Sequence, residues 1–150
     1  MEKRPFPVLR ERGQSLLLAL FATLCLGSAA SAADVSVLVD GLRGEVGLLR
    51  VAICTQGDFL TAKCAITASA PAPQGKVRLS DVPAGQYAIQ AYHDENSNGR
   101  LDRNMLGRPM EGMAFSRDAP MRFGPPRYAD AVVTIPETGG TTTMTMRYFR

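Results

Sequence analysis

Short segments of this 150-residue chain alternate between hydrophobic and polar residues with a period of two. Such alternation is typical of a β-strand with one buried face. It occurs at residues 35–39, 76–79, 87–93, 131–135 and 144–148, and residues 46–53 form a more continuous apolar run rich in β-branched side chains. A further short strand is expected near Gly112–Phe115. No segment after residue 33 keeps a helical period for a dozen residues, so the pattern predicts an all-β protein.

Turn-forming residues separate these segments. Asp40-Gly41 follows the first segment, and Pro83 and Gly85 precede the strand that begins near Tyr87. Short alternating strands with turns between them favour an antiparallel sandwich or a barrel. Two segments, residues 68–74 and the Gly/Pro-rich residues 104–127, are expected to be long loops, the second containing the short strand named above.

The first 32 residues have the three-part pattern of a secretory signal peptide. Four basic residues lie within the first twelve positions, residues 16–26 are almost entirely apolar, and small residues follow from Gly27 to Ala33. The tripeptide Ala30-Ser31-Ala32 matches a cleavage site, so we expect a periplasmic or secreted protein whose single mature domain is residues 33–150. The apolar run is short of the roughly 20 residues that cross a bilayer, which argues against the alternative of an uncleaved anchor. Cys25 raises a lipoprotein alternative, which the bulky Leu24 before it disfavours.

Removal of this leader changes the charge balance and the cysteine count. The full chain has 17 Lys and Arg against 14 Asp and Glu, and the leader carries four of the bases and two of the acids, so 13 remain against 12. A net charge of +1 without a clustered basic face gives no reason to expect a nucleic-acid partner. Cleavage leaves Cys54 and Cys64, an even pair in an oxidising compartment, and we expect them to form a disulfide bond rather than two buried thiols.

The segment 94–102 has the most specific chemistry of the chain. Alternate polar side chains followed by Gly99 match the front of a calcium-binding loop, in which oxygens converge on the ion. The candidate ligands are Asp94, Asn96, Asn98, Asp102 and the backbone carbonyl of Arg100. Met105 stands where such loops carry a bidentate Glu, and Glu111 is the nearest downstream carboxylate, so affinity for Ca²⁺ is expected to be weak, on the order of 10⁻⁴–10⁻³ M. The alternative is a polar hairpin turn, because turns use the same residues.

Support for enzymatic chemistry is slight. The chain has a single histidine, His93, and we find no nucleophile elbow and no nucleotide-binding glycine motif. Glu111 with Asp94 or Asp102 forms the kind of carboxylate pair that a small hydrolase uses for acid–base catalysis. Ion binding explains the same carboxylates with fewer assumptions. We expect His93 to serve packing or hydrogen bonding.

Two motifs carry a resemblance to known proteins. Residues 79–87 (LSDVPAGQY) look like a turn-to-strand corner of transthyretin-like and collagen-adhesin-B-like sandwiches. Residues 93–102 (HDENSNGRLD), followed by residues 106–112 (LGRPMEG) and Gly124-Pro125-Pro126, resemble the secreted bacterial family catalogued as domain of unknown function 2141. The resemblance extends from about Val35 to Tyr148. It implies a small β-sandwich of about seven strands, immunoglobulin-like or transthyretin-like, and an exported location, and it implies no activity.

These observations favour an exported, non-enzymatic β-sandwich that acts as a binding or accessory protein of the bacterial cell envelope. The expected partner is a cell-envelope protein or a glycan. The alternatives are the small carboxylate-dependent hydrolase and a structural module stabilised by calcium.

Overall fold

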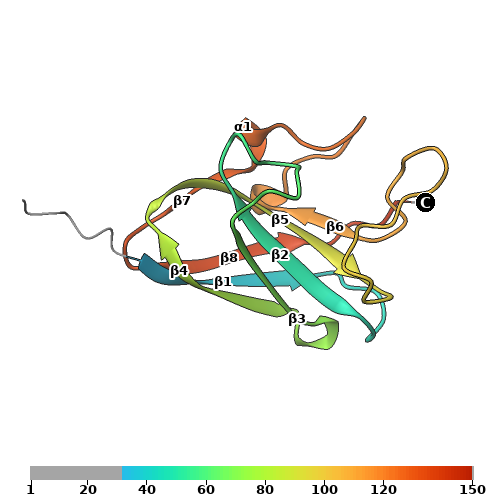
Figure 1. Cartoon of the computed structure of the whole chain (residues 1–150), viewed down its shortest axis with the longest axis horizontal. Helices are drawn as coiled ribbons and strands as arrows, with labels where there is room; N and C mark the ends of the chain where they lie inside the picture. Colours follow the sequence, from blue (N-terminus) through green and yellow to red (C-terminus); the bar gives the residue numbers. More distant parts are fainter. Residues whose placement is uncertain (1–31, 150) are drawn as a thin grey trace, which may run out of the picture.

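The computed structural model describes residues 32–149, and these residues form the all-β fold that the sequence predicts (Figure 1). The strands are β1 (Ala32–Asp40), β2 (Leu48–Cys54), β3 (Ile66–Pro71), β4 (Lys76–Pro83), β5 (Gly85–Asp94), β6 (Met113–Phe115), β7 (Val132–Ile135) and β8 (Gly140–Thr145). Helical structure is confined to one α-helical turn, α1 (Tyr128–Ala131), and two 3₁₀ turns, η1 (Ala72–Gln74) and η2 (Ser116–Asp118).

The strands form two sheets. One has the order β4-β1-β8, and the other has the order β3-β2-β5-β6, with β7 paired to β5 as well. Strands β7 and β6 share one edge of β5. Strand β7 pairs with residues 85–88 of β5, and β6 pairs with residues 90–92 of β5. Most pairs are antiparallel as expected, but β1 and β8 run parallel, with Val35 opposite Gly140. The prediction of a purely antiparallel sandwich is therefore wrong at this pair, because the direction of a pairing between chain ends depends on tertiary packing.

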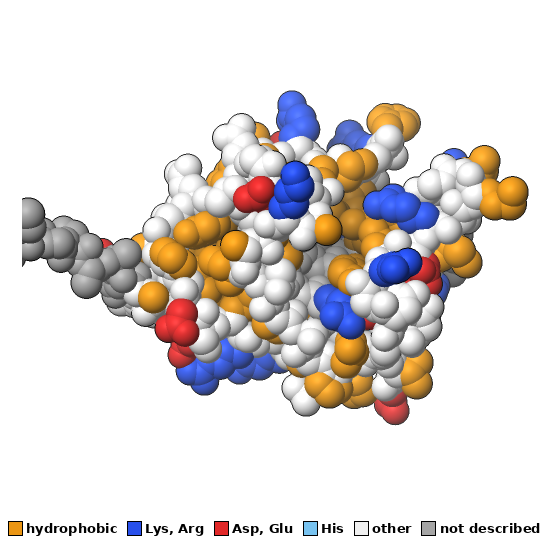
Figure 2. All heavy atoms as spheres, in the orientation of Figure 1, with side chains coloured by type: hydrophobic (Ala, Val, Ile, Leu, Met, Phe, Trp, Pro, Cys, Tyr) orange, Lys and Arg blue, Asp and Glu red, His pale blue; other side chains and the backbone are white. Residues whose placement is uncertain are grey.

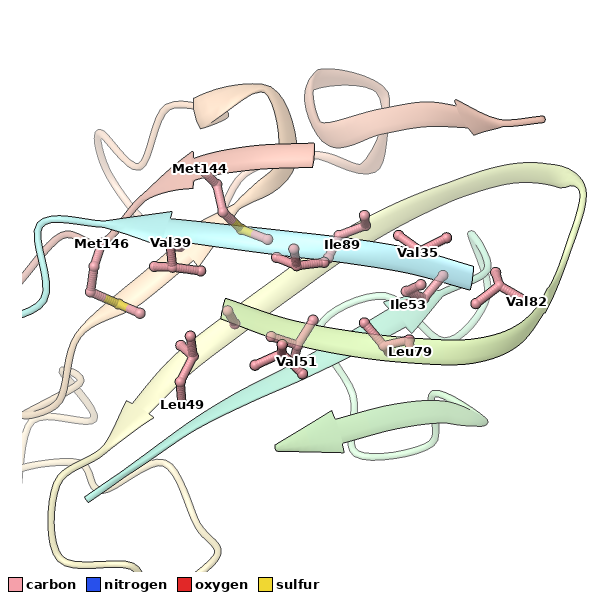
Figure 3. Packing of buried hydrophobic residues seen from close by; sticks show 14 of the residues in the cluster. Val35, Val39, Leu49, Val51, Ile53, Leu79, Val82, Ile89, Met144 and Met146 are labelled. Atoms are coloured by element: carbon pink, nitrogen blue, oxygen red, sulfur yellow. The ribbon is translucent and has the colours of Figure 1, made fainter. Parts of the chain in front are cut away.

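The core lies between the two sheets (Figure 3). In β1, the alternation expected from the sequence places Val35, Val37 and Val39 inward, each at most 4% exposed. They face residues from β2 and β5, among them Val51 and Ile89. Burial of such side chains stabilises the fold by roughly 1.5–3 kcal/mol each, which explains why the strand pattern alone identifies most of the core.

A second, smaller cluster covers the outer face of the five-stranded sheet. Its members are Cys54, Phe59, Cys64, Ala88, Phe115, Ala119 and Ala131. Ala88 and Phe115 lie on the opposite face from their buried neighbours Ile89 and Ala114, so both faces of β5 and β6 are covered here. The segments that cover this face are residues 55–64 and the loop that leads from β6 to α1, and they also position the candidate site.

The prediction of a loop at residues 68–74 is wrong for residues 68–71. Residues 66–71 form β3, which pairs along β2 from Ile53↔Ile66 to Leu48↔Pro71. Half-buried Ile66, Ala68 and Ala70 alternate with exposed residues, but the small side chains hide the period in the sequence. An edge strand needs only one partner, so β2 can hold a segment of weak intrinsic preference.

The predicted leader covers residues 1–32. Residues 1–31 lie outside the described residues, and Ala32 is the first residue of β1. Within residues 32–149, no helix combines the length and the hydrophobicity that crossing a membrane requires.

Candidate functional site

A broad groove of about 1110 Å³ lies on the outer face of the five-stranded sheet. Gln90 and Tyr92 of β5 and Met113 of β6 contribute to its lining from the sheet. Around them stand residues 60–62, 99–101, 103, 106–109 and 121–125, together with Tyr148 and Phe149 near the chain end. Figure 2 shows an apolar hollow bordered by Lys and Arg side chains on the side where these loops project.

Four arginines line this groove: Arg100, Arg103, Arg108 and Arg122. All four are exposed, and none of them forms an ion pair with a residue in the described range 32–149. The lining contains no Asp or Glu. We call this surface the arginine groove, because its unpaired positive charge next to apolar side chains favours a ligand that has both anionic and apolar parts.

One wall of the arginine groove belongs to the disulfide loop. Cys54 and Cys64 are joined, with Cα atoms 4.8 Å apart, so the expected disulfide is present in the structure. Gln90 holds the loop to the sheet, since its side-chain oxygen accepts the Leu60 amide at 3.1 Å and its amide nitrogen donates to the Thr61 carbonyl at 3.3 Å. The disulfide and Gln90 together fix the position of Leu60 beside the groove.

A short hairpin, residues 102–110, forms the opposite wall. Met110 N donates to the Asp102 carbonyl and Asn104 N to the Arg108 carbonyl, each at 2.9 Å. The Asn104 side chain accepts the amides of both Leu106 and Arg108 at 3.0 Å. This closed hydrogen-bond pattern holds the tip of the hairpin in one shape, and Leu106 at that tip is 83% exposed.

The polar segment 94–102 lies at the base of this hairpin and is organised by Asp94. Its carboxylate is fully buried and accepts hydrogen bonds from Asn98 N and Gly99 N, each at 2.9 Å, and from Arg50 Nε at 2.6 Å. Burial disfavours the charged form, but these hydrogen bonds outweigh burial and hold the pKa of Asp94 below 3.8. Asp94 therefore acts as an anionic cap for the loop.

Glycine is required where this loop meets the β1–β2 connection. Gly47 has a φ of +86°, and a side chain there would place its Cβ 2.3 Å from the backbone oxygen of Asp94. Only glycine permits both the backbone angle and this approach.

Glu111 holds the other side of the same loop. It is 4% exposed, and its two carboxylate oxygens accept Glu95 N and Asp102 N, each at 3.0 Å. The Asp102 carboxylate in turn accepts the side-chain amides of Asn96, at 2.7 Å, and Asn98, at 3.1 Å. The loop is thus closed by its own donors and acceptors.

The four side chains proposed as calcium ligands, those of Asp94, Asn96, Asn98 and Asp102, therefore lie in one loop but already have protein partners. Asn96 and Asn98 use their side-chain oxygens to accept the backbone amides of Asn98 and Arg100. Within residues 32–149, no group of three or more His, Cys, Asp or Glu side chains is gathered to hold a metal ion. Asp94, Asp102 and Glu111 also do not line the arginine groove, so the carboxylate pair of the hydrolase alternative does not face it.

His93 is buried between two hydrogen-bond partners. Its Nε2 lies 2.7 Å from the Val46 carbonyl, which requires Nε2 to donate, and its Nδ1 lies 2.7 Å from the Tyr148 hydroxyl. The Tyr148 hydroxyl also accepts Arg43 N at 3.0 Å, and its ring borders the arginine groove. His93 thus anchors the chain end beside the groove, the packing and hydrogen-bonding role expected from the sequence.

The groove arginines were missed by sequence reasoning, except for the Arg100 carbonyl. A local charge imbalance offered a clue, since residues 100–127 contain six Arg and three Asp or Glu. The near balance of acidic and basic residues over residues 33–150 as a whole hides this local excess. The apolar tips, Leu106 and Phe123, give no periodic pattern and are visible only in the fold.

The fold and this site define a small all-β sandwich domain with a basic groove on one outer face. The sequence matches the model of an uncharacterised family conserved in bacteria, domain of unknown function 2141, over residues 37–144. The chain belongs to this family, which confirms the resemblance carried by residues 93–102, 106–112 and 124–126. No curated protein and no solved structure matches the chain.

Proposed function

We infer that this protein is an exported, non-enzymatic binding module of the bacterial cell envelope and that the arginine groove is its binding surface. The observation that carries this proposal is the groove itself, where four arginines without ion pairs in residues 32–149 stand beside apolar side chains. The disulfide supports export, because such bonds persist in oxidising compartments. The candidate carboxylates support a non-enzymatic role, because each of them is engaged in holding a loop.

Binding to washed envelope fragments of the native organism tests this proposal. The double variant Arg108→Glu/Arg122→Glu reverses two groove charges whose side chains make no hydrogen bond within the described residues, and we expect it to lower the sedimented fraction at least tenfold. The matched control is Lys76→Glu, which reverses an exposed charge on β4, outside the groove. Equal sedimentation of the groove variant and the control would contradict the proposal.

Weak calcium binding by the segment 94–102 is a separate hypothesis. It requires Ca²⁺ to replace the donors that now occupy Asp94 and Asp102, among them the Arg50 guanidinium. The alternative of a self-bonded polar turn requires no such exchange. The bonding of these side chains favours the turn.

A further inference from the structure

Two loops beside the arginine groove expose large apolar side chains at their tips. Met105 and Leu106 are 104% and 83% exposed at the tip of the 102–110 hairpin, and Phe123 is 105% exposed in the loop between η2 and α1. Both loops project on the same side of the sandwich, toward the right and upper right of Figure 1. Leu106 and Phe123 border the same groove.

We propose that these two loops and the arginines between them dock on the surface of an anionic lipid bilayer. The inference rests on the proposed function and deepens it by naming the partner. The apolar tips enter the boundary between headgroups and acyl chains, and the arginines contact lipid phosphates.

The charge of the surface favours an anionic partner. Arg103 and Arg108 lie on the hairpin that carries the first tip, and Arg122 directly precedes the second tip at Phe123. No acidic side chain lines the groove between them. Guanidinium groups bind phosphate oxygens with charge-assisted hydrogen bonds, so phosphate-bearing lipids complement this surface.

The direction of the tips favours a bilayer over a small ligand held within the groove. A ligand inside the groove would contact side chains that line it from the sheet, such as Tyr92 and Met113, which are half-buried. Met105 and Phe123 are instead as exposed as in an extended chain, and a small ligand in the groove would leave them in water. To remove both tips from water at once, the partner must present an extended surface. Large apolar side chains next to cations are typical of contacts with a membrane surface.

The local structure of the hairpin fits this use. Asn104 accepts two amides of the hairpin, and Arg103 Nη1 donates to the Gly107 carbonyl at 2.9 Å. The tip is therefore ordered before it meets a partner, so little conformational entropy is lost on binding.

Sedimentation with lipid vesicles tests the proposal on the native protein. We expect binding to vesicles of about one third phosphatidylglycerol in phosphatidylcholine, and at least tenfold weaker binding to pure phosphatidylcholine. The variant Arg108→Gln should lower the partition coefficient about fivefold, and Phe123→Ser about tenfold. Raising the salt concentration to about 0.5 M should also weaken binding, because the arginine contacts are screened.

Two exposed residues outside the groove provide matched controls. Lys76→Gln removes a positive charge from β4, and Val46→Ser removes an apolar side chain that is 67% exposed. Neither should change the partition coefficient by more than about twofold. Circular dichroism and thermal melting of every variant verify that the fold is retained.

The sequence contains no tryptophan, so a single introduced Trp reports on insertion without interference. Phe123→Trp should shift its emission to the blue when phosphatidylglycerol vesicles are added, because the indole leaves water. The emission of the control Val46→Trp should show no shift. Both substitutions keep an apolar residue at the position, and the emission shift tests insertion without relying on a loss of binding.

Three outcomes would overturn the proposal: no binding to either vesicle, equal binding to both, or loss of binding in the control variants to the same degree as in the groove variants. The first outcome can occur together with binding to envelope fragments. That combination would leave the arginine groove as a binding surface for an envelope protein or a glycan, so failure of the lipid proposal is distinguishable from failure of the proposed function.

Discussion

At Asp94, burial and hydrogen bonding act on the same carboxylate in opposite directions. Three donors prevail and lower its pKa, so the carboxylate in the folded protein is more acidic than in the unfolded chain. Its contribution to stability is therefore complete above pH ~4, near the unfolded pKa, and disappears as the pH falls through the folded value. The sequence showed an Asp at the start of a polar loop but not the Arg50 that neutralises it, which comes from β2.

We expect Asp94→Asn to lower the free energy of unfolding at pH 7 by about 2 kcal/mol, because Arg50 loses its buried anionic partner. The difference between the native protein and this variant should shrink as the pH falls below about 4. Urea denaturation at a series of pH values measures both effects. Asp102→Asn is the control, because this partly exposed carboxylate accepts only side-chain amides, and its replacement should cost less than about 1 kcal/mol. A difference for Asp94→Asn that stays constant with pH would contradict the pKa argument.

The bonding within the segment 94–102 also leads to an expectation about calcium. Because the side-chain oxygens among the candidate ligands already accept protein donors, we expect the melting temperature in millimolar calcium to equal that in chelator. If Ca²⁺ displaces these donors, a concentration tenfold above Kd would stabilise the fold by about 1.4 kcal/mol. That corresponds to a rise of roughly 3–6 °C in melting temperature for a domain of this size. Such a rise, absent in Asp94→Ala, would establish the calcium hypothesis.

Among the structural elements, the disulfide loop joins a feature predicted from the sequence to one visible only in the fold. The predicted pairing of Cys54 with Cys64 followed from an even cysteine count after residue 32 and from the expectation of export. The structure adds that both sulfurs are buried beside Phe59 and that the loop forms a wall of the arginine groove. No property of the sequence linked these two features, because Gln90 connects the loop to the sheet from another strand.

We expect the double variant Cys54→Ala/Cys64→Ala to lower the free energy of unfolding by about 2–3 kcal/mol, as the chain-entropy model gives for a sequence separation of 10 residues. Guanidinium denaturation with and without reductant measures this effect. The native protein should lose stability when reductant is added, whereas the double variant should show no response. A native protein insensitive to reductant under unfolding conditions would count against a stabilising disulfide.

For the whole molecule, the predicted cleavage site after Ala32 lies at the start of β1. Ala33 pairs with Val82, and Ala32 pairs with Pro83 at the very beginning of the strand. Cleavage after Ala32 removes one terminal pair and keeps the inward-facing Val35, Val37 and Val39. The fold is thus compatible with a mature protein that begins at Ala33.

We expect intact-mass analysis of the native protein to show a chain that begins within a residue or two of Ala33, recovered from the periplasm or the medium. Replacement of Ala30 and Ala32 by bulky residues should block processing, because the cleavage site requires small side chains. The same replacement at Ala33 serves as a control. A full-length species held in the membrane would contradict the export prediction.

The sequence by itself determined the β-strands with clear alternation, the central core valines, the cysteine pair and the family, because each depends on local periodicity or on a contiguous motif. Only the tertiary structure decided the parallel pairing of β1 with β8, the edge strand β3, the loop-capping role of Asp94 and the existence of the arginine groove. Each of these depends on which distant segments meet. The groove in particular joins the outer face of β5 and β6 to three loops and the chain end, and no pattern along the chain records that proximity.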